Sequence, residues 1–290
     1  MKERWGETYG LVSKSIDVLR KSYTSDIQVG FGSFVDKPVQ PFAITNATAD
    51  VMNKTRVSAN FDPLEGGLDA IVQASVCPNI IGWRNQSRRI LVYVSDSGFH
   101  FAGDGKLAGI DEPNDGLCHL APNAQSTEEY IYTHSKVLDY PSFGLVKKVL
   151  TENKISSLFL VPESDKEVYK GLTDFIGDQS STAELTGDNM RLYRFIESLA
   201  RRLYIIAEDL PEGLDVKAET SCNKHVASTF NLKEESVKCS QLEIGQEVDI
   251  RVTITLNGCP KNGKRKNIRL VPSGVQESVL IETEYACDSD

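Results

Sequence analysis

The chain contains few cysteines and histidines, and their spacing matches no metal-binding or redox motif. Its six cysteines, at positions 77, 118, 222, 239, 259 and 287, include no C-x-x-C pair. The four histidines, at positions 100, 119, 134 and 225, are too scattered to predict a zinc site. Disulfide bonds are therefore the better interpretation of the cysteines, and they are typical of extracellular proteins.

Sequence motifs for catalysis are also lacking. The chain has no G-x-S-x-G elbow, and the sequence shows no histidine positioned to activate a cysteine nucleophile. Carboxylates that hold a cation are not free for acid–base chemistry, so we expect a protein that is not an enzyme. One alternative stays open, a metal-dependent hydrolase, which would need an activated water and would lose its turnover in a Glu65→Ala variant.

Long apolar runs are absent as well. The N-terminal Met-Lys-Glu-Arg-Trp is not an apolar signal segment, and no run of about 20 apolar residues could span a membrane. Three N-x-S/T sequons, at Asn46, Asn53 and Asn85, would be glycosylated in the secretory pathway and agree with oxidised cysteines. The sequence thus predicts an extracellular protein without a signal segment or membrane anchor of its own, and it indicates a fragment or truncated product.

Positive charge is scarce, since the formal net charge is -9. Binding to nucleic acid needs a concentrated basic surface, so no nucleic-acid partner is expected. The one basic cluster, residues 261–266, surrounds Asn262-Gly263 between two alternating runs, and it predicts a solvated hairpin tip.

The first two thirds of the chain show helical and strand patterns in alternation. Helices are expected at residues 11–23, 66–76, 143–150, 166–175 and 189–203, and strands at residues 27–35, 90–94 and 155–161. This alternation, with continuous apolar strands, predicts an α/β fold with a doubly wound, mostly parallel sheet. In such a sheet the ligand site lies at the carboxyl ends of the strands.

The pattern changes near Leu203. Apolar residues from Val248 to Leu256 alternate with polar ones at a period of two, and residues 278–285 alternate similarly. This pattern predicts a β-sandwich, or half of one. We therefore expect two domains, at residues 1–202 and 203–290.

An acidic stretch precedes the helix expected at 66–76. It carries Asn60, Asp62 and Glu65 on one turn-rich loop, and the Leu64 carbonyl could add a further oxygen. Calcium prefers oxygen ligands of this kind, about six to eight in number. A solvated acidic turn is the alternative, because short loops rich in Asn, Asp and Glu are common.

Two further aspartates follow expected strands. Asp36 comes after residues 27–35 and Asp96 after residues 90–94, so both should lie at the site edge of the sheet beside Asp62 and Glu65. Clustered carboxylates cost several kcal/mol unless a cation or a proton offsets their charge. The sequence therefore favours a metal site at this edge.

At these residues the chain resembles the extracellular part of an integrin beta subunit, across nearly its whole length. The resemblance rests on VGFGSFVDKP (29–38), EGGLDAI (65–71), IGWRN (81–85), GFHFAGDGKLAG (98–109) and PNDGLC (113–118). It implies a von Willebrand factor A-like inserted domain at 1–202 that lacks its first strand, followed by the C-terminal half of the hybrid β-sandwich domain at 203–290.

The resemblance also implies metal ligands. Asp36, Asn60, Asp62, the Leu64 carbonyl and Glu65 correspond to the family's synergistic Ca²⁺ site. Glu65 and Asp96 correspond to two ligands of its Mg²⁺-dependent adhesion site, where Mn²⁺ is an alternative ion and an acidic side chain of the ligand completes the shell.

Some family features are expected to be missing. The D-x-S-x-S motif that supplies the other magnesium ligands would lie before Met1, so ligand binding by this chain is expected to be weak or absent. Glu3-Arg4 stands where the family has paired aspartates of an adjacent calcium site, and residues 41–53 replace a longer disulfide-closed loop that helps to set specificity.

Disulfides Cys77–Cys118 and Cys222–Cys239 are likewise implied by the resemblance, which leaves Cys259 and Cys287 to pair with each other or with partners elsewhere.

The resemblance implies a cell-adhesion receptor that pairs with an integrin alpha subunit on the extracellular side of the plasma membrane and takes part in integrin-mediated signalling. Its ligands would be extracellular-matrix or cell-surface proteins with an acidic residue. A soluble decoy or alpha-binding fragment without adhesive activity is the alternative.

Overall fold

The computed structural model describes most of the 290 residues of the chain. The described residues are 16–17, 20–21, 26–34, 36–37, 43–45, 62–85, 87–124, 126–185, 197–198, 201–223, 226–243, 246–258, 265–272 and 277–284. The chain divides into two compact units, Met1–Tyr193 and Arg194–Asp290, which are described separately.

The first unit is built on a parallel sheet. Its described strands are β3 (Arg89–Val94), β6 (Ile155–Val161) and β7 (Ser180–Glu184), in the order β3-β6-β7. Leu158 and Phe159 are neighbours on β6 and therefore point to opposite faces, yet both are fully buried. Both faces of the central strand are thus covered, as a parallel sheet requires.

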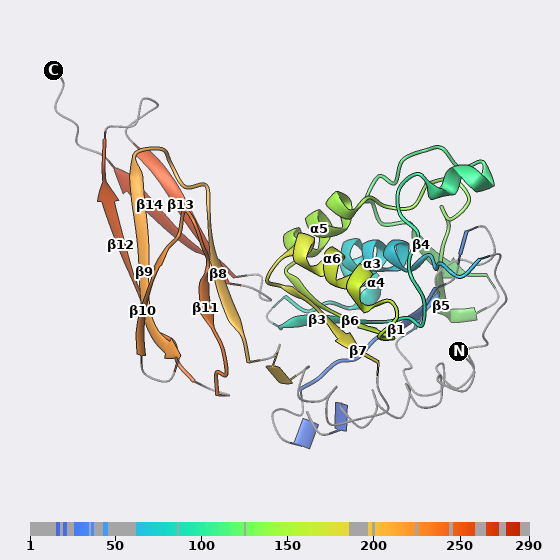
Figure 1. The fold of residues 1–290 in the computed structure, drawn as a ribbon, viewed down its shortest axis with the longest axis horizontal. Coiled ribbons are helices and arrows are strands. Elements are labelled where there is room, and N and C mark those ends of the chain that lie inside the picture. Colours follow the sequence, from blue (N-terminus) through green and yellow to red (C-terminus); the bar gives the residue numbers. More distant parts are fainter. Residues whose placement is uncertain are drawn as a thin grey trace. The chain divides into compact units, whose positions relative to one another are not determined.

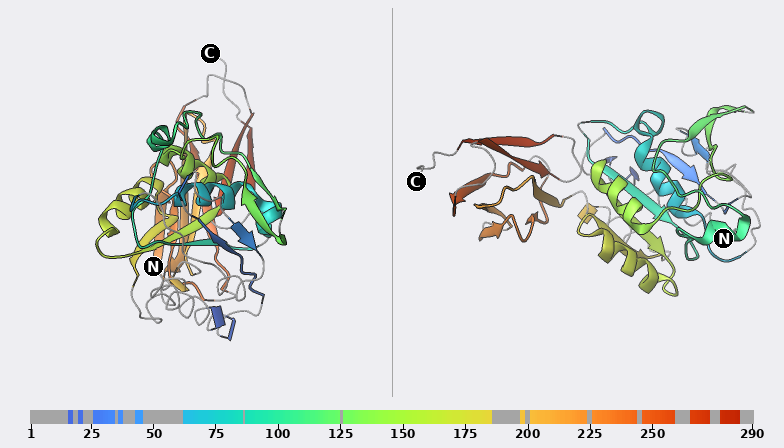
Figure 2. Two further views of the ribbon diagram at one scale, coloured as in Figure 1. Left: turned by 90° about the vertical axis from the view of Figure 1, so that its right-hand side faces the viewer. Right: turned by 90° about the horizontal axis from the view of Figure 1, so that it is seen from above.

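Three helices lie on one face of this sheet (Figures 1 and 2). They are α3 (Gly67–Val76), α5 (Phe143–Glu152) and α6 (Lys166–Ile176), and the short helices α4 (Pro78–Ile81) and η1 (Asp104–Ala108) lie in the connections. Leu68, Ile71 and Val72 share one face of α3 at helical spacing and are almost completely buried. Burial of that face against the sheet fixes the helix.

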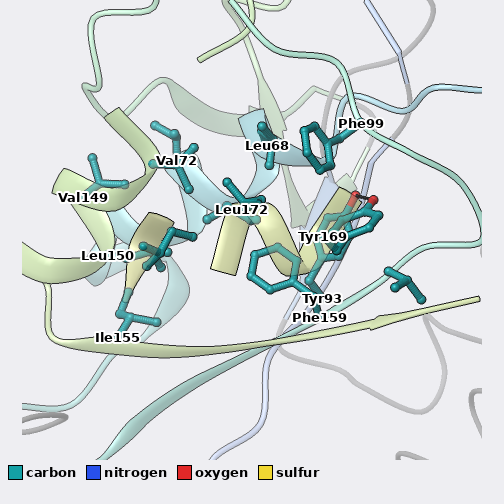
Figure 3. Packing of buried hydrophobic residues seen from close by; sticks show 14 residues of the cluster. Leu68, Val72, Tyr93, Phe99, Val149, Leu150, Ile155, Phe159, Tyr169 and Leu172 are labelled. Carbon is teal, nitrogen blue, oxygen red and sulfur yellow. Dashed lines mark hydrogen bonds between the residues drawn. The ribbon is translucent and has the colours of Figure 1, made fainter. Parts of the chain in front are cut away.

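An aromatic cluster fills the space between helices and sheet. Figure 3 shows Tyr93 of β3, Phe159 of β6 and Tyr169 of α6 packed together, with ring centroids 5.2 to 5.7 Å apart. The Tyr93 and Tyr169 hydroxyl oxygens are 3.1 Å apart and share a hydrogen bond. Gly67 begins α3 against this cluster, and a Cβ at this position would overlap the Tyr93 ring. Glycine therefore lets the start of α3 approach β3 closely.

A second sheet in this unit is antiparallel. It contains β1 (Phe31–Ser33), β2 (Ala43–Thr45), β5 (Ser126–Tyr132) and β4 (Leu120–Asn123), in the order β1-β2-β5-β4. The strand expected at 27–35 is therefore wrong in length and in partner, because β1 has three residues and pairs antiparallel with β2. Gly30 interrupts the apolar run directly before β1, and glycine weakens a strand interior.

The second unit is a β-sandwich. One sheet has the order β10-β9-β12 and the other β11-β8-β13-β14. The strands are β8 (Leu203–Glu208), β9 (Leu214–Asn223), β10 (Val226–Asn231), β11 (Val237–Cys239), β12 (Ile250–Leu256), β13 (Arg265–Pro272) and β14 (Val279–Glu284). Leu214 and Val216 of β9 belong to one buried cluster with Val237 and Ile268 of the other sheet. The predicted fold class, an α/β unit with a parallel sheet followed by a β-sandwich, is confirmed.

The basic cluster at 261–266 is not the tip of a hairpin. The strands that flank it, β12 and β13, belong to different sheets. Alternation along two neighbouring runs shows that both are strands, but it does not show that they pair. Residues 261–264 themselves lie outside the described residues.

The described part of each unit contains one disulfide. Cys77 at the end of α3 is bonded to Cys118, and Cys222 of β9 is bonded to Cys239 of β11. Gln73 of α3 supports the first, since its side chain donates to the Leu117 carbonyl (2.9 Å) and accepts from the His119 amide (2.7 Å). Both pairs implied by the family resemblance are thus present. Cys259 and Cys287 lie outside the described residues.

The helices expected at 66–76, 143–150 and 166–175 and the strands expected at 90–94 and 155–161 are confirmed to within two residues at each end. Most of the helices expected at 11–23 and 189–203 lies outside the described residues. Within the described part of the chain, no helix is long and apolar enough to cross a membrane.

Candidate metal centre

Two loops lie side by side at the carboxyl end of β3. One precedes α3 and contains Asp62 and Glu65, and the other follows β3 through Asp96 and Gly98. The Glu65 amide donates to the Gly98 carbonyl (3.2 Å), and the Glu65 carbonyl accepts from the His100 amide (3.0 Å). This short parallel bridge fixes the acidic loop against the end of the sheet, at the edge where a doubly wound fold places its ligand site.

Three side chains from separate segments converge at this edge. They are Asp36, Asp62 and His100, and one ligand atom of each lies within 4.8 Å of the others. His100 Nε2 is 3.3 Å from Asp62 Oδ1 and 3.6 Å from Asp36 Oδ1. Asp36 and His100 are buried, whereas the Asp62 side chain is 43% exposed. The three side chains thus form a largely buried group that reaches solvent on the side of Asp62.

A local turn positions the Asp62 side chain beside Asp36 and His100. Its Oδ1 accepts a hydrogen bond from the Leu64 amide (2.8 Å), which closes an Asx-type turn. The Ser97 hydroxyl donates to the Pro63 carbonyl, so the turn is also held by the loop that follows β3. The turn chemistry of the sequence therefore holds a carboxylate at the edge of the site.

The His100 ring is held on its other side. Its Nδ1 lies 3.1 Å from Asp104 Oδ2, and the ring stacks on Tyr140 with centroids 4.7 Å apart. Asp139 accepts from the amides of Gly103 (2.6 Å) and Gly105 (2.8 Å) and thereby fixes the loop that carries Asp104.

A buried ion pair lies directly beside Asp36. Lys37 Nζ is 2.6 Å from Asp69 Oδ2 of α3, and these side chains are only 3% and 7% exposed. The same Nζ donates to the Leu138 carbonyl (2.8 Å) and lies about 5 Å from the ring centroids of Tyr132 and Tyr140. The ion pair connects the segment that carries Asp36 to the first turn of α3.

Burial sets the pKa values of this ion pair. It raises the pKa of Asp69 to about 6 although the Lys37 charge acts in the opposite direction. It also lowers the pKa of Lys37 against the attraction of Asp69. Both shifts have the same cause, the loss of hydration around a charged group.

The donors present here fit a cation. Asp36 and Asp62 bring two carboxylates to one point from segments 26 residues apart, and such oxygens are the ligands of hard divalent ions. The Leu64 carbonyl belongs to the same loop as Asp62. A cation at this point would offset the mutual repulsion of the carboxylates.

The predicted ligands are only partly brought together. Asp36 and Asp62 meet, and Leu64 and Glu65 follow Asp62 on the same loop. In the described part of the chain, Glu65 and Asp96 are not members of the group that contains Asp36. Asn60 lies outside the described residues. Of the three expected glycosylation sites, Asn85 is exposed, and Asn46 and Asn53 lie outside the described residues.

His100, Asp104 and the Lys37–Asp69 pair were missed from the sequence. The only local signal is the separation of His100 and Asp104 by four residues, within the stretch that follows Asp96. The convergence of His100 on Asp36 and Asp62 depends on three distant segments, and spacing along the chain does not show it.

Comparison with known proteins identifies similar chains. A family model described as the integrin beta chain VWA domain matches residues 45–204. Integrin beta-1-A of Xenopus laevis is 36% identical over 302 aligned residues, which cover 92% of this chain and 36% of the relative. Integrin beta-PS of Drosophila melanogaster is 34% identical (92% and 34% covered), and integrin beta pat-3 of Caenorhabditis elegans is 31% identical (93% and 36% covered). The chain spans about a third of the length of these curated relatives.

Proposed function

Because the chain belongs to the integrin beta family of cell-adhesion receptors, we propose that it carries a metal-dependent ligand-binding surface of such a receptor. The receptor is a heterodimer with an integrin alpha subunit on the extracellular side of the plasma membrane. It binds matrix or cell-surface proteins through an acidic residue and takes part in integrin-mediated signalling. We propose 1–202 and 203–290 as the two domains of this chain, with the boundary just before β8 and nine residues after that between the two compact units.

The observation that carries this proposal is the convergence of the Asp36 and Asp62 carboxylates on one point. Two carboxylates held close together raise the free energy of the folded state unless a positive charge lies between them. We assign a calcium ion to this position, with Asn60, the Leu64 carbonyl and Glu65 as further ligands.

Glu65 and Asp96 are proposed as ligands of a second ion, Mg²⁺ or Mn²⁺. The bridge between Glu65 and Phe99 supports this, since it places the loops that carry Glu65 and Asp96 side by side. This ion would bind the acidic side chain of the adhesion ligand, because a charge-assisted contact can anchor a small interface. Glycans are proposed at the three sequons, and the exposure of Asn85 agrees with this assignment.

Calcium titration of the whole chain by calorimetry tests the proposal. The metal-free protein should bind Ca²⁺, and an Asp62→Ala variant should lose the binding because it removes a ligand from the exposed side of the site. Asp111→Ala is the matched control, since Asp111 is an exposed loop aspartate outside the group. Equal calcium affinity in the Asp62→Ala variant and the wild type would contradict the assignment.

A further inference from the structure

The loop that carries Asp96 is held by hydrogen bonds to the residue that follows it. The Ser97 carbonyl accepts from the Tyr169 hydroxyl (2.8 Å) and from the Ser95 hydroxyl (3.0 Å). The Ser95 Oγ in turn accepts from the Ser97 amide (3.2 Å). Asp96 therefore lies between two residues that are fixed to each other, and one of the groups that fix them comes from α6, 72 residues along the chain from Ser97.

A second tyrosine extends this hydrogen-bond chain. The Tyr93 and Tyr169 hydroxyl oxygens are 3.1 Å apart. A carbonyl oxygen only accepts, so the single hydroxyl hydrogen of Tyr169 is used by Ser97, and Tyr93 must be the donor to Tyr169. Burial raises the pKa of Tyr169 to about 12, so this hydrogen is present at neutral pH. The chain runs in one direction, from Tyr93 through Tyr169 to the Ser97 carbonyl.

Packing accounts for the two tyrosine rings but not for their hydroxyls. Both side chains are almost completely buried, and Phe159 packs against both rings in the same cluster (Figure 3). A phenylalanine at position 169 would keep the ring contacts and would bring no polar group into the core. What the Tyr169 hydroxyl adds is a directional bond to the loop after β3.

The two tyrosines reach both loops of the metal centre. The Tyr93 hydroxyl lies against Gly67, where an added Cβ would overlap it, and Gly67 comes two residues after Glu65. On the other loop, the Ser97 hydroxyl donates to the Pro63 carbonyl, in the acidic loop before α3. A shift of Ser97 would therefore disturb both loops.

We infer that Tyr169 is a positioning residue for the metal centre, because its hydroxyl holds the Ser97 carbonyl and thereby keeps Asp96 in the geometry that binds the ion. The inference rests on the proposed function, in which Asp96 is a ligand of Mg²⁺ or Mn²⁺. It adds a residue of α6, a helix to which no metal ligand is assigned. Residues that orient ligands from outside change metal affinity by about 10- to 100-fold, and an effect through one backbone carbonyl should lie at or below the lower limit.

Thr173 provides a matched control on the same helix. Its side chain is buried, and its hydroxyl oxygen lies 3.1 Å from both the Lys170 carbonyl and the Thr182 hydroxyl of β7. Thr173→Val removes a buried, hydrogen-bonded hydroxyl of α6, as Tyr169→Phe does, but this hydroxyl contacts neither metal loop. Both variants should lose some stability, whereas only Tyr169→Phe should affect the metal centre.

The test combines hydrogen exchange, followed by NMR, with a Mn²⁺ titration of the whole chain. The Glu65 and His100 amides form the bridge between the two loops. In metal-free Tyr169→Phe both amides should exchange about 3- to 10-fold faster than in the wild type, because one bond that holds the loop is lost. Mn²⁺ binding, measured by loss of the free-ion electron paramagnetic resonance signal, should weaken by about 3- to 10-fold. Thr173→Val should match the wild type in both measurements.

The outcomes separate this inference from the proposed function. Unchanged exchange at both amides in Tyr169→Phe, or an equal change in Thr173→Val, overturns the inference and leaves the proposed metal centre in place. Faster exchange with unchanged Mn²⁺ affinity also overturns it, since the loop would then be held without effect on the ion. If the wild type binds no Mn²⁺, the second ion of the proposed function fails, and the exchange rates alone decide whether Tyr169 positions the loop.

A further variant covers the case in which Tyr169→Phe does not fold, as judged by tryptophan fluorescence. Ser95→Ala removes the other donor to the same carbonyl and should give the same two changes. If it leaves both exchange and Mn²⁺ affinity as in the wild type, the position of the Ser97 carbonyl does not matter to the metal centre, and the inference is overturned.

Discussion

The two units of the chain differ in the kind of side chains that they bury. In the first unit, charged side chains from several segments are buried together, among them Asp36, Lys37, Asp69 and Asp139. In the described part of the second unit, the buried polar set consists of Thr220 alone. Its core is formed by apolar side chains that alternate along the strands, as Val252 and Ile254 do on β12.

This difference indicates where function lies. A buried charge lowers stability unless a partner or an ion compensates it, so a fold that needs only stability has no reason to bury one. In the described part of the β-sandwich, the ion pair between Arg265 and Glu284 lies on the surface, and these side chains are 80% and 66% exposed. The α/β unit buries Asp36, Lys37 and Asp69 near one edge of its sheet, where the metal centre is proposed.

The largest expected effect comes from breaking the buried ion pair. Lys37→Met removes the cation and leaves Asp69 buried without it, so the first unit should lose about 3 to 5 kcal/mol of unfolding free energy. Both tryptophans precede residue 193, so denaturation followed by their fluorescence reports this unit. Arg265→Met, which breaks an exposed pair in the second unit, should cost less than about 1 kcal/mol by calorimetry. Similar losses in both variants would remove the contrast between the units.

The disulfides should show a smaller contrast. In the chain-entropy model, the 41-residue separation of Cys77 and Cys118 corresponds to about 4 kcal/mol, and the 17-residue separation of Cys222 and Cys239 to about 3 kcal/mol. Replacing each pair by alanines should cost about these amounts. Hydrogen exchange should locate each loss in the unit that contains the disulfide. Faster exchange in α3 after removal of the second disulfide would contradict independent stabilisation of the two units.

The sequence predicted those helices and strands in which the buried residues recur at the regular spacing of a helix or of a strand. The helix α3 was found because Leu68, Ile71 and Val72 recur at helical spacing, and β12 because its apolar residues alternate. These patterns depend only on which face of an element is covered. The position of Asp62 on a turn before α3 was visible for the same local reason.

What the sequence did not show depends on contacts between distant segments. Asp36 was expected at the end of a parallel strand, but it follows a short antiparallel one and still reaches Asp62. His100 joins them through the bridge between Glu65 and Phe99, which no spacing along the chain predicts. Buried polar groups satisfy one another in three dimensions, so their partners were the part that only the structure could provide.

The last prediction concerns pH and separates the units by their titration. Burial raises the pKa of Asp69 from 3.8 to about 6, so the folded state binds this proton more tightly than the unfolded state. Stability from this group is complete below pH 3.8 and is lost as the pH rises through about 6. The lowered pKa of Lys37 acts in the opposite direction, since its stability penalty disappears as the pH rises towards 10.5.

The unfolding free energy of the wild type, relative to a Lys37→Met/Asp69→Asn variant, should therefore fall between pH 4 and 6 and rise again at alkaline pH. Denaturation followed by tryptophan fluorescence across this range measures the difference, and parallel profiles would mean that the ion pair does not titrate as its burial requires. Hydrogen exchange in β13 and β14 of the same two proteins should be identical at every pH, because the ion pair belongs to the first unit.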